Sequence, residues 1–172
     1  LEREHQNRAK QNATLSTKKN AAFRESCYVE IAETEKQFYK DLRCLVDEYM
    51  EPMAQKGLLT TARASTIFRN VREIMNLSKE LYNALNREGQ RSQIFADAFA
   101  KYSPFFDMYT IYCSGYGRAV DCLKECRSKN TRLQKWLASK SGTIGLDSML
   151  VKPVQRICKY PLFLRELIKS TS

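Results

Sequence analysis

The side chains best able to bind a metal ion or to act as a nucleophile are six cysteines and one histidine. Structural zinc sites need four Cys or His ligands close together. Cys122 and Cys126 are four residues apart on an expected helix, but no Cys-x-x-Cys pair or further ligand completes the set. His5 lies in a polar segment without a nucleophile or orienting carboxylate nearby. We therefore expect no catalytic residues, no metal and no cofactor, and reduced, mostly packed thiols in a cytoplasmic protein.

The last quarter of the chain offers polar side chains for binding. Val151, Gln155 and Lys159 follow one another at i, i+4 and i+8, so on a helix they form one line along its surface. This line carries a small apolar group, an amide and an ammonium, and it is flanked by Lys152 and Arg156. The alternative is a solvated basic face, because runs of charge on a helix usually face water.

The net charge of +10 is unevenly distributed along the chain. Residues 1–24 carry a net +4, residues 25–126 a net −2 and residues 127–172 a net +8. A basic surface can bind nucleic acid, anionic lipid or an acidic protein face, and composition does not choose among them. Because no zinc-finger spacing or aromatic RNA-binding signature accompanies the charge, we expect no nucleic-acid partner.

Helices are expected to position these side chains. The 172 residues include only six glycines and four prolines, whereas strand-rich folds with many tight turns use more. With 43% hydrophobic and 28% charged residues, the composition is that of a globular domain. No apolar run approaches the roughly 20 residues of a membrane-spanning helix, and the chain does not start with the apolar core of a secretory signal.

Apolar residues recur every three or four positions from Arg24 onward, the spacing of one helical face. The first helix is expected to end at Pro52 and Gly57. Its apolar stripe consists of Ile31, Phe38, Leu42, Leu45 and Tyr49. Further helical patterns cover residues 67–85, 94–112, 116–126 and 133–137.

Pro104 interrupts the pattern over residues 94–112 and should kink or divide that helix. The last segment contains a heptad-like apolar seam that we expect to be buried. The seam consists of Leu150, Val154, Ile157, Pro161, Leu164 and Ile168. The sequence therefore predicts an all-α protein, an elongated bundle of about five or six helices.

Two motifs resemble the Dbl homology domain, the guanine nucleotide exchange module for Rho-family GTPases. Residues 152–167, KPVQRICKYPLFLREL, resemble its third conserved region, whose pattern is close to K-P-x-Q-R-x-x-K-Y-P-L-L-L-x-E-L. The motif EIAETE at 30–35, continued by Phe38, Tyr39 and Leu42, resembles its first region, E-L-x-x-T-E-x-x-Y-x-x-x-L. The resemblance covers nearly the whole chain from about residue 25.

This resemblance implies an exchange factor that acts by binding a Rho- or Rac-type GTPase, rearranging its two switch loops and releasing GDP. Magnesium and nucleotide belong to the GTPase. Glu30 matches the family glutamate that contacts switch I, and Gln155 and Lys159 match residues that contact switch II. Val151 matches a position that helps to select the GTPase, where β-branched residues tend toward Rac-type partners.

The chain also departs from the family pattern. Dbl homology domains usually continue into a long final helix, and a pleckstrin homology domain commonly follows, whereas this sequence stops at Ser172. We expect a polar lead-in at 1–22 and a C-terminally incomplete Dbl homology domain at 23–172, recruited to membranes only through other domains. A helical scaffold that binds a GTPase or another protein without exchange is the alternative. A basic nucleic-acid or lipid-surface binder ranks third.

Overall fold

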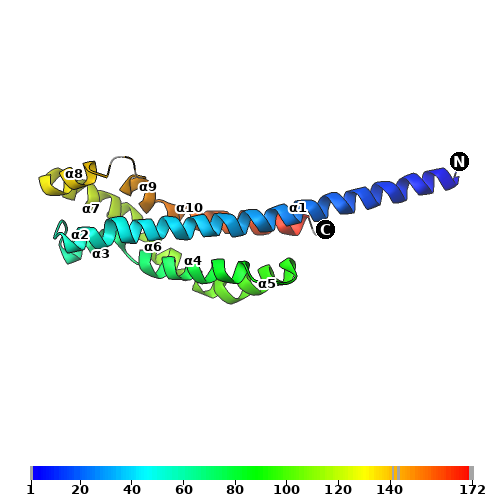
Figure 1. Ribbon diagram of the computed structural model, residues 1–172, viewed down its shortest axis with the longest axis horizontal. Coiled ribbons are helices and arrows are strands. Elements are labelled where there is room, and N and C mark those ends of the chain that lie inside the picture. The colour runs from blue at the N-terminus through cyan, green and yellow to red at the C-terminus, as the bar shows by residue number, and fades with distance from the viewer. Residues whose placement is uncertain (1, 141, 143, 171–172) are drawn as a thin grey trace.

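The computed structural model describes residues 2–140, 142 and 144–170, with side chains from Thr14 onward. In these ranges all regular secondary structure is helical, which confirms the predicted fold class. Figure 1 shows an elongated bundle in which one long helix, α1 (Glu2–Cys44), spans the length of the molecule. This helix continues through the π-helical turn η1 (Leu45–Met50) into α2 (Glu51–Gln55).

Shorter helices pack around the C-terminal half of α1 (Figure 1). In chain order they are α3 (Thr61–Phe68), α4 (Val71–Leu85), α5 (Arg91–Tyr102), the 3-10 turn η2 (Ser103–Phe106), α6 (Asp107–Ser114), α7 (Tyr116–Lys129), α8 (Thr131–Ala138), α9 (Leu146–Leu150) and α10 (Lys152–Lys169). Several expected helices are therefore divided. The division at η2 contains Pro104, as the sequence predicts. No helix in the described ranges is both long and apolar enough to cross a membrane.

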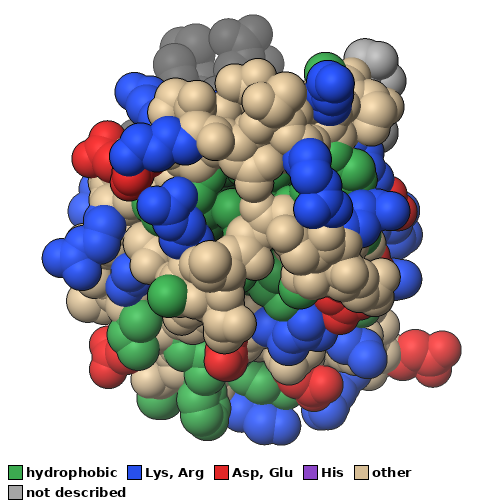
Figure 2. Space-filling model, turned by 90° about the vertical axis from the view of Figure 1, so that its left-hand side faces the viewer, with side chains coloured by type: hydrophobic (Ala, Val, Ile, Leu, Met, Phe, Trp, Pro, Cys, Tyr) green, Lys and Arg blue, Asp and Glu red, His purple; other side chains and the backbone are tan. Residues whose placement is uncertain are grey.

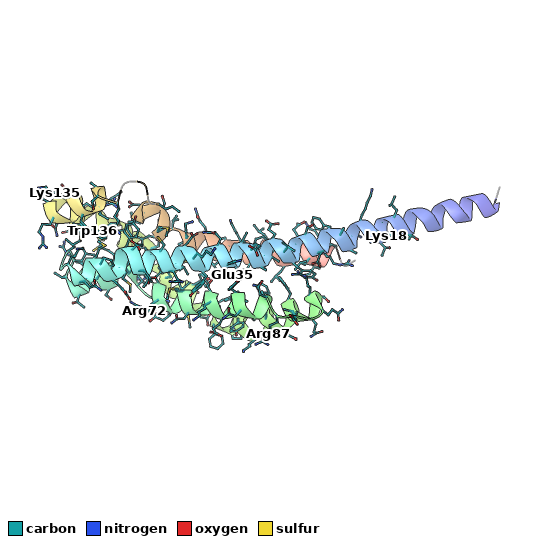
Figure 3. The ribbon with its side chains drawn as sticks, in the orientation of Figure 1. Lys18, Glu35, Arg72, Arg87, Lys135 and Trp136 are labelled. Carbon is teal, nitrogen blue, oxygen red and sulfur yellow. The ribbon has the colours of Figure 1, made fainter. Side chains whose placement is uncertain are left out.

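The N-terminal part of α1 projects beyond the bundle. At 1.5 Å per residue its 43 residues span about 65 Å, and Figure 3 shows Lys18 on the projecting part. All side chains from Thr14 to Phe23 are exposed. The expected polar lead-in is thus a helical extension of α1, and the domain boundary at residue 22 stays a prediction.

The pattern over residues 67–85, expected to be one helix, is divided between α3 and α4. Arg69 ends α3 with a φ of +49°, a backbone conformation that a non-glycine residue rarely adopts. Its guanidinium donates to the carbonyl oxygen of Ile111 at 2.6 and 3.1 Å. It also occupies the space beside Gly115, where a Cβ atom would lie 1.8 Å from it. These contacts with α6 and the start of α7 are long-range, so periodicity could not predict the break.

The core lies where α1 meets α4 and α10. All five residues of the predicted first stripe are buried, which confirms the expected inward face of α1. The largest fully buried side chains are Tyr49, Tyr109, Tyr112, Phe68, Ile31, Leu42, Leu45, Met53, Ile67, Ile74, Leu81 and Leu85.

The predicted seam of α10 is wrong in part. Leu150, at the end of α9, is buried, but Pro161 is exposed and Ile168 is 66% exposed. The remaining three members are half-buried. The buried face of α10 instead consists of Pro153, Arg156, Tyr160 and Leu167. The rotation of α10 about its axis brings Arg156 toward an acidic partner on α1, and the spacing of apolar residues does not predict such an ionic contact.

Candidate functional site

A buried ionic cluster joins α1 to α10. Glu35 of α1 is fully buried, and its carboxylate accepts hydrogen bonds from Arg156 Nε at 3.0 Å and Nη2 at 2.6 Å. Tyr160 Oη donates to it at 2.8 Å, and Ser78 Oγ of α4 donates at 2.5 Å. Figure 3 shows Glu35 in the middle of the bundle. Arg156, expected on the basic surface, is therefore a core residue, 4% exposed, and that expectation is corrected.

The electrostatics of this cluster favour the charged pair. Burial is the largest single influence on Arg156 and by itself lowers its pKa, but the charge of Glu35 and the hydrogen bonds to Glu35 and Tyr160 together raise the pKa above its usual value. Burial, together with the same negative charge, raises the pKa of Tyr160 well above its ordinary range. Tyr160 thus stays a neutral hydrogen-bond donor to Glu35.

The two helices run antiparallel in a fixed register. Arg24 Nη1 donates to the carbonyl oxygen of Ser170 at 2.5 Å, near the C-terminal end of α10. Arg156 Nη1 donates to Thr34 Oγ1 at 3.0 Å, one turn after the first residue of α10. Lys152 and Asp41 pair at its first turn. Each step forward along α1 thus corresponds to a step back along α10.

An open pocket of about 210 Å³ lies between α1 and α10. It is lined by Thr34, Gln37, Phe38, Asp41, Lys152, Gln155, Arg156 and Lys159. Gln155 and Lys159, two of the residues singled out from the sequence, are exposed and share this pocket. Their amide and ammonium groups are available to a partner's oxygen atoms.

Glu30 lies beyond the end of the pocket on α1. It is exposed, as expected, and precedes Thr34 by one helical turn. The Thr34 hydroxyl donates to the Glu30 carbonyl oxygen at 2.7 Å. Within the described part of the chain, the Glu30 carboxylate has no ion-pair partner, so it can accept hydrogen bonds from another protein.

Val151 does not line the pocket. It forms the junction between α9 and α10, and its N–H donates to the carbonyl oxygen of Asp147 at 3.3 Å. Its side chain is half-buried rather than exposed, so the site assumed from the sequence is less accessible than expected. Val151 still precedes Gln155 by one turn, next to the pocket rather than in it.

Sequence reasoning missed the polar residues that α1 contributes to the pocket. Gln37 Nε2 donates to Asp41 Oδ1 at 2.9 Å, and Lys152 Nζ donates to Asp41 Oδ2 at 2.7 Å. Asp41 is only 8% exposed, so this ion pair forms the floor of the pocket. The signal was present in the sequence, because Glu30, Thr34, Gln37 and Asp41 follow one another at steps of four, three and four.

The cysteines serve as packing groups and surface thiols. All six are free. Cys126 is buried and accepts a hydrogen bond from Arg63 Nη1 at 3.3 Å, and burial raises the pKa of the neighbouring Cys122 thiol. Among the described residues, no group of three His, Cys, Asp or Glu side chains could hold a metal ion. His5 lies outside the residues whose side chains are described.

The basic surplus of the last quarter is divided between two places. Figure 2 views the end of the bundle near α2 and α8, where Lys and Arg side chains surround apolar and neutral ones. Figure 3 shows Lys135 and Trp136 at this end. Ion pairs neutralise part of the surplus, including Arg127 with Asp147 at 2.7 Å and Lys140 with Glu48 at 2.8 Å. On α10, Lys152 and Lys159 line the pocket, whereas Arg156 is buried.

Residues 27–172 match the RhoGEF domain family, so the chain belongs to that family, and the resemblance to Dbl homology domains is confirmed.

Relatives and solved structures agree with this membership. The chain is 32% identical over 161 residues to the myosin-M heavy chain of Dictyostelium discoideum, covering 89% of this chain and 9% of that protein. It is 36% identical over 146 residues to human pleckstrin homology domain-containing family G member 2, covering 81% of this chain and 10% of that protein. A structure of the Vav1 exchange factor matches with a TM-score of 0.82 and 26% identity, over 88% of this chain and 42% of that one. The chain thus spans about a tenth of the length of the Dictyostelium and human relatives.

Proposed function

We propose that this domain promotes GDP release from a Rho- or Rac-type small GTPase. The observation that carries the proposal is family membership over residues 27–172. Gln155 and Lys159 in one open pocket, with Glu30 exposed one helical turn before the pocket residue Thr34, support it. An exchange factor of this kind performs no covalent chemistry. It acts by binding the emptied GTPase more tightly than the nucleotide-bound form.

Each helix has a distinct part in the proposed mechanism. Glu30 on α1 accepts hydrogen bonds from backbone N–H groups of switch I, while Gln155 and Lys159 on α10 bind switch II. The two switches must be held at a fixed separation for the nucleotide site to open. The buried cluster of Glu35 and Arg156 supplies that fixed separation, because it ties α1 to α10 next to both contact lines.

Release of a fluorescent GDP analogue from a panel of Rho- and Rac-type GTPases tests the proposal. We expect at least one GTPase to release nucleotide faster in the presence of the chain. Stable binding to a nucleotide-free GTPase without faster release would favour the scaffold alternative. Absence of GTPase binding, with steeply salt-dependent binding to anionic polymers, would favour the basic-surface reading instead.

The same proposal includes a cytoplasmic location with recruitment to membranes through other domains. The six free thiols support a reducing compartment.

Substitution of Val151 by leucine is expected to change the choice of GTPase. We expect the parent chain to favour Rac-type GTPases modestly, and V151L to lower the Rac-to-Rho ratio of exchange rates by about three- to tenfold. The reason is that one methylene in a contact discriminates only moderately. The melting temperature should barely change, because Val151 is half-buried and the added group can extend toward solvent. Identical ratios for both proteins in the exchange panel would show that Val151 does not select.

A further inference from the structure

A second groove lies away from the pocket between α1 and α10. It is formed where α4 meets the end of α5, the turn η2 and the start of α6, and its volume is about 310 Å³. Figure 1 shows α4 and α5 together below α1. Among the described residues, this α4–α6 groove shares no lining residue with the pocket between α1 and α10. It is therefore a separate surface, and its use does not depend on the proposed exchange function.

The walls of the α4–α6 groove are apolar. They consist of Leu77, Tyr102, Phe105 and Met108. Leu77 and Tyr102 are buried and form the floor, whereas Phe105 is 50% exposed. The ring of Phe106, the next residue of η2, stacks on Tyr160 of the core with 5.0 Å between the ring centroids. Because η2 is anchored through Phe106, Phe105 stays at the surface and keeps apolar area in contact with water, as binding surfaces do.

Two carboxylates line the same groove. Glu73, Leu77 and Glu80 follow one another at steps of four and three, so they lie along one face of α4. Both glutamates are exposed, and neither has an ion-pair partner within the described part of the chain. Arg72, next to Glu73 in sequence, pairs instead with Glu51 at 3.0 Å. No lysine or arginine is among the described residues that line the groove, so an apolar floor has a negative rim in a chain of net charge +10.

We propose that the α4–α6 groove binds a basic amphipathic helix of another protein. The two carboxylates are seven residues apart, about 10 Å along the axis of α4. A helix that packs along α4 presents its own residues i and i+7 at the same separation, so lysine or arginine at these positions pairs with Glu73 and Glu80. A large apolar residue at i+3 or i+4 then enters the groove beside Phe105. Burial of that side chain supplies affinity, and the charges fix the register and select the partner.

A pair of synthetic peptides tests the proposal. The probe is a labelled helix of about 16 residues, rich in alanine and glutamine, with one phenylalanine flanked by lysines at i and i+7. The control peptide has glutamate at both lysine positions. We expect the full chain to bind the lysine peptide at least tenfold more tightly in fluorescence anisotropy titrations. The net charge of +10 attracts the glutamate peptide non-specifically, so this preference can arise only from a locally negative surface.

Substitutions in the groove locate the bound peptide. E73Q/E80Q removes both carboxylates and keeps the side-chain volume, and F105A removes the exposed wall. Each should weaken binding of the lysine peptide at least fivefold. E88Q/D121N removes the same charge from exposed positions that do not line the groove and should bind like the parent. All three variants should melt at the parent temperature, because the changed side chains are exposed.

Four results would overturn the proposal. The first is failure of the lysine peptide to bind more tightly than the glutamate peptide. The second is parent-like binding by E73Q/E80Q, and the third is an equal loss in E88Q/D121N, since either places the peptide elsewhere. The fourth is self-association of the parent chain in sedimentation equilibrium that F105A abolishes, which would assign the groove to a second copy of this chain. If F105A melts well below the parent, E73Q/E80Q decides, because glutamine preserves the shape of the groove.

Discussion

Replacement of Arg156 by methionine is expected to lower the free energy of unfolding by about 3–5 kcal/mol. The substitution keeps much of the side-chain volume but removes both charge-assisted hydrogen bonds to Glu35. Glu35 is fully buried, so its charge would remain in the core without a compensating cation. For a domain of this size the loss corresponds to a fall of about 10 °C in melting temperature. Thermal and urea unfolding of the parent chain and of R156M measure this loss of stability.

Arg72 offers a matched control for the same chemical change. Its guanidinium pairs with Glu51 at 3.0 Å, but both side chains are nearly half exposed. R72M should therefore cost less than about 1 kcal/mol, as exposed ion pairs generally do. The double variant E35Q/R156M should be more stable than the sum of the losses in E35Q and R156M predicts, because removal of both charges leaves no unpaired charge in the core. Equal losses of unfolding free energy in R156M and R72M would show that burial does not increase the contribution of the Glu35–Arg156 pair.

Alanine at Glu30 or at Lys159 should reduce exchange at least tenfold, which corresponds to about 1.4 kcal/mol or more at the barrier. Each substitution removes one side of the proposed contact with the GTPase switches. The melting temperature should hardly change, because both side chains are exposed and contribute little to the core. The measurement is the initial rate of release of a fluorescent GDP analogue at fixed concentrations of chain and GTPase.

Two exposed charges serve as controls for these variants. Glu25 is 55% exposed on α1, lies about 140° around the helix from Glu30 and pairs with Arg91 of α5. Lys79 is an exposed lysine of α4, outside the α1–α10 surface. E25A and K79A should retain parent-like exchange. Parent-like exchange by E30A and K159A would contradict the assignment, whereas a fall shared by all four variants would indicate a general charge effect.

Much of the fold could be predicted from local patterns. The stripe from Ile31 to Tyr49 correctly predicted the inward face of α1, because a 3.6-residue period depends only on the helix itself. The break at Pro104 was also predictable, because a proline ring removes a backbone donor wherever it lies. The motifs at 30–35 and 152–167 were sufficient to identify the family.

The candidate site was only partly predictable. The spacing of Gln155 and Lys159 indicated a shared line, and both residues do share one pocket. The contribution of Gln37 and Asp41 was missed, because a polar stripe on α1 becomes part of a pocket only when α10 packs beside it. Whether these residues contact a GTPase stays a prediction.

The amino-acid sequence by itself determined the helices, the family and the residues that can form one line on a helix surface. Only the tertiary structure decided which line faces inward. On α10 the apolar spacing favoured a seam through Ile157 and Ile168, yet the helix turns Arg156 toward the core. The physical reason is that helical periodicity is a local property, whereas the burial of a charge depends on its partner. Arg156 can be buried only because Glu35, 121 residues earlier in the chain, is held opposite it.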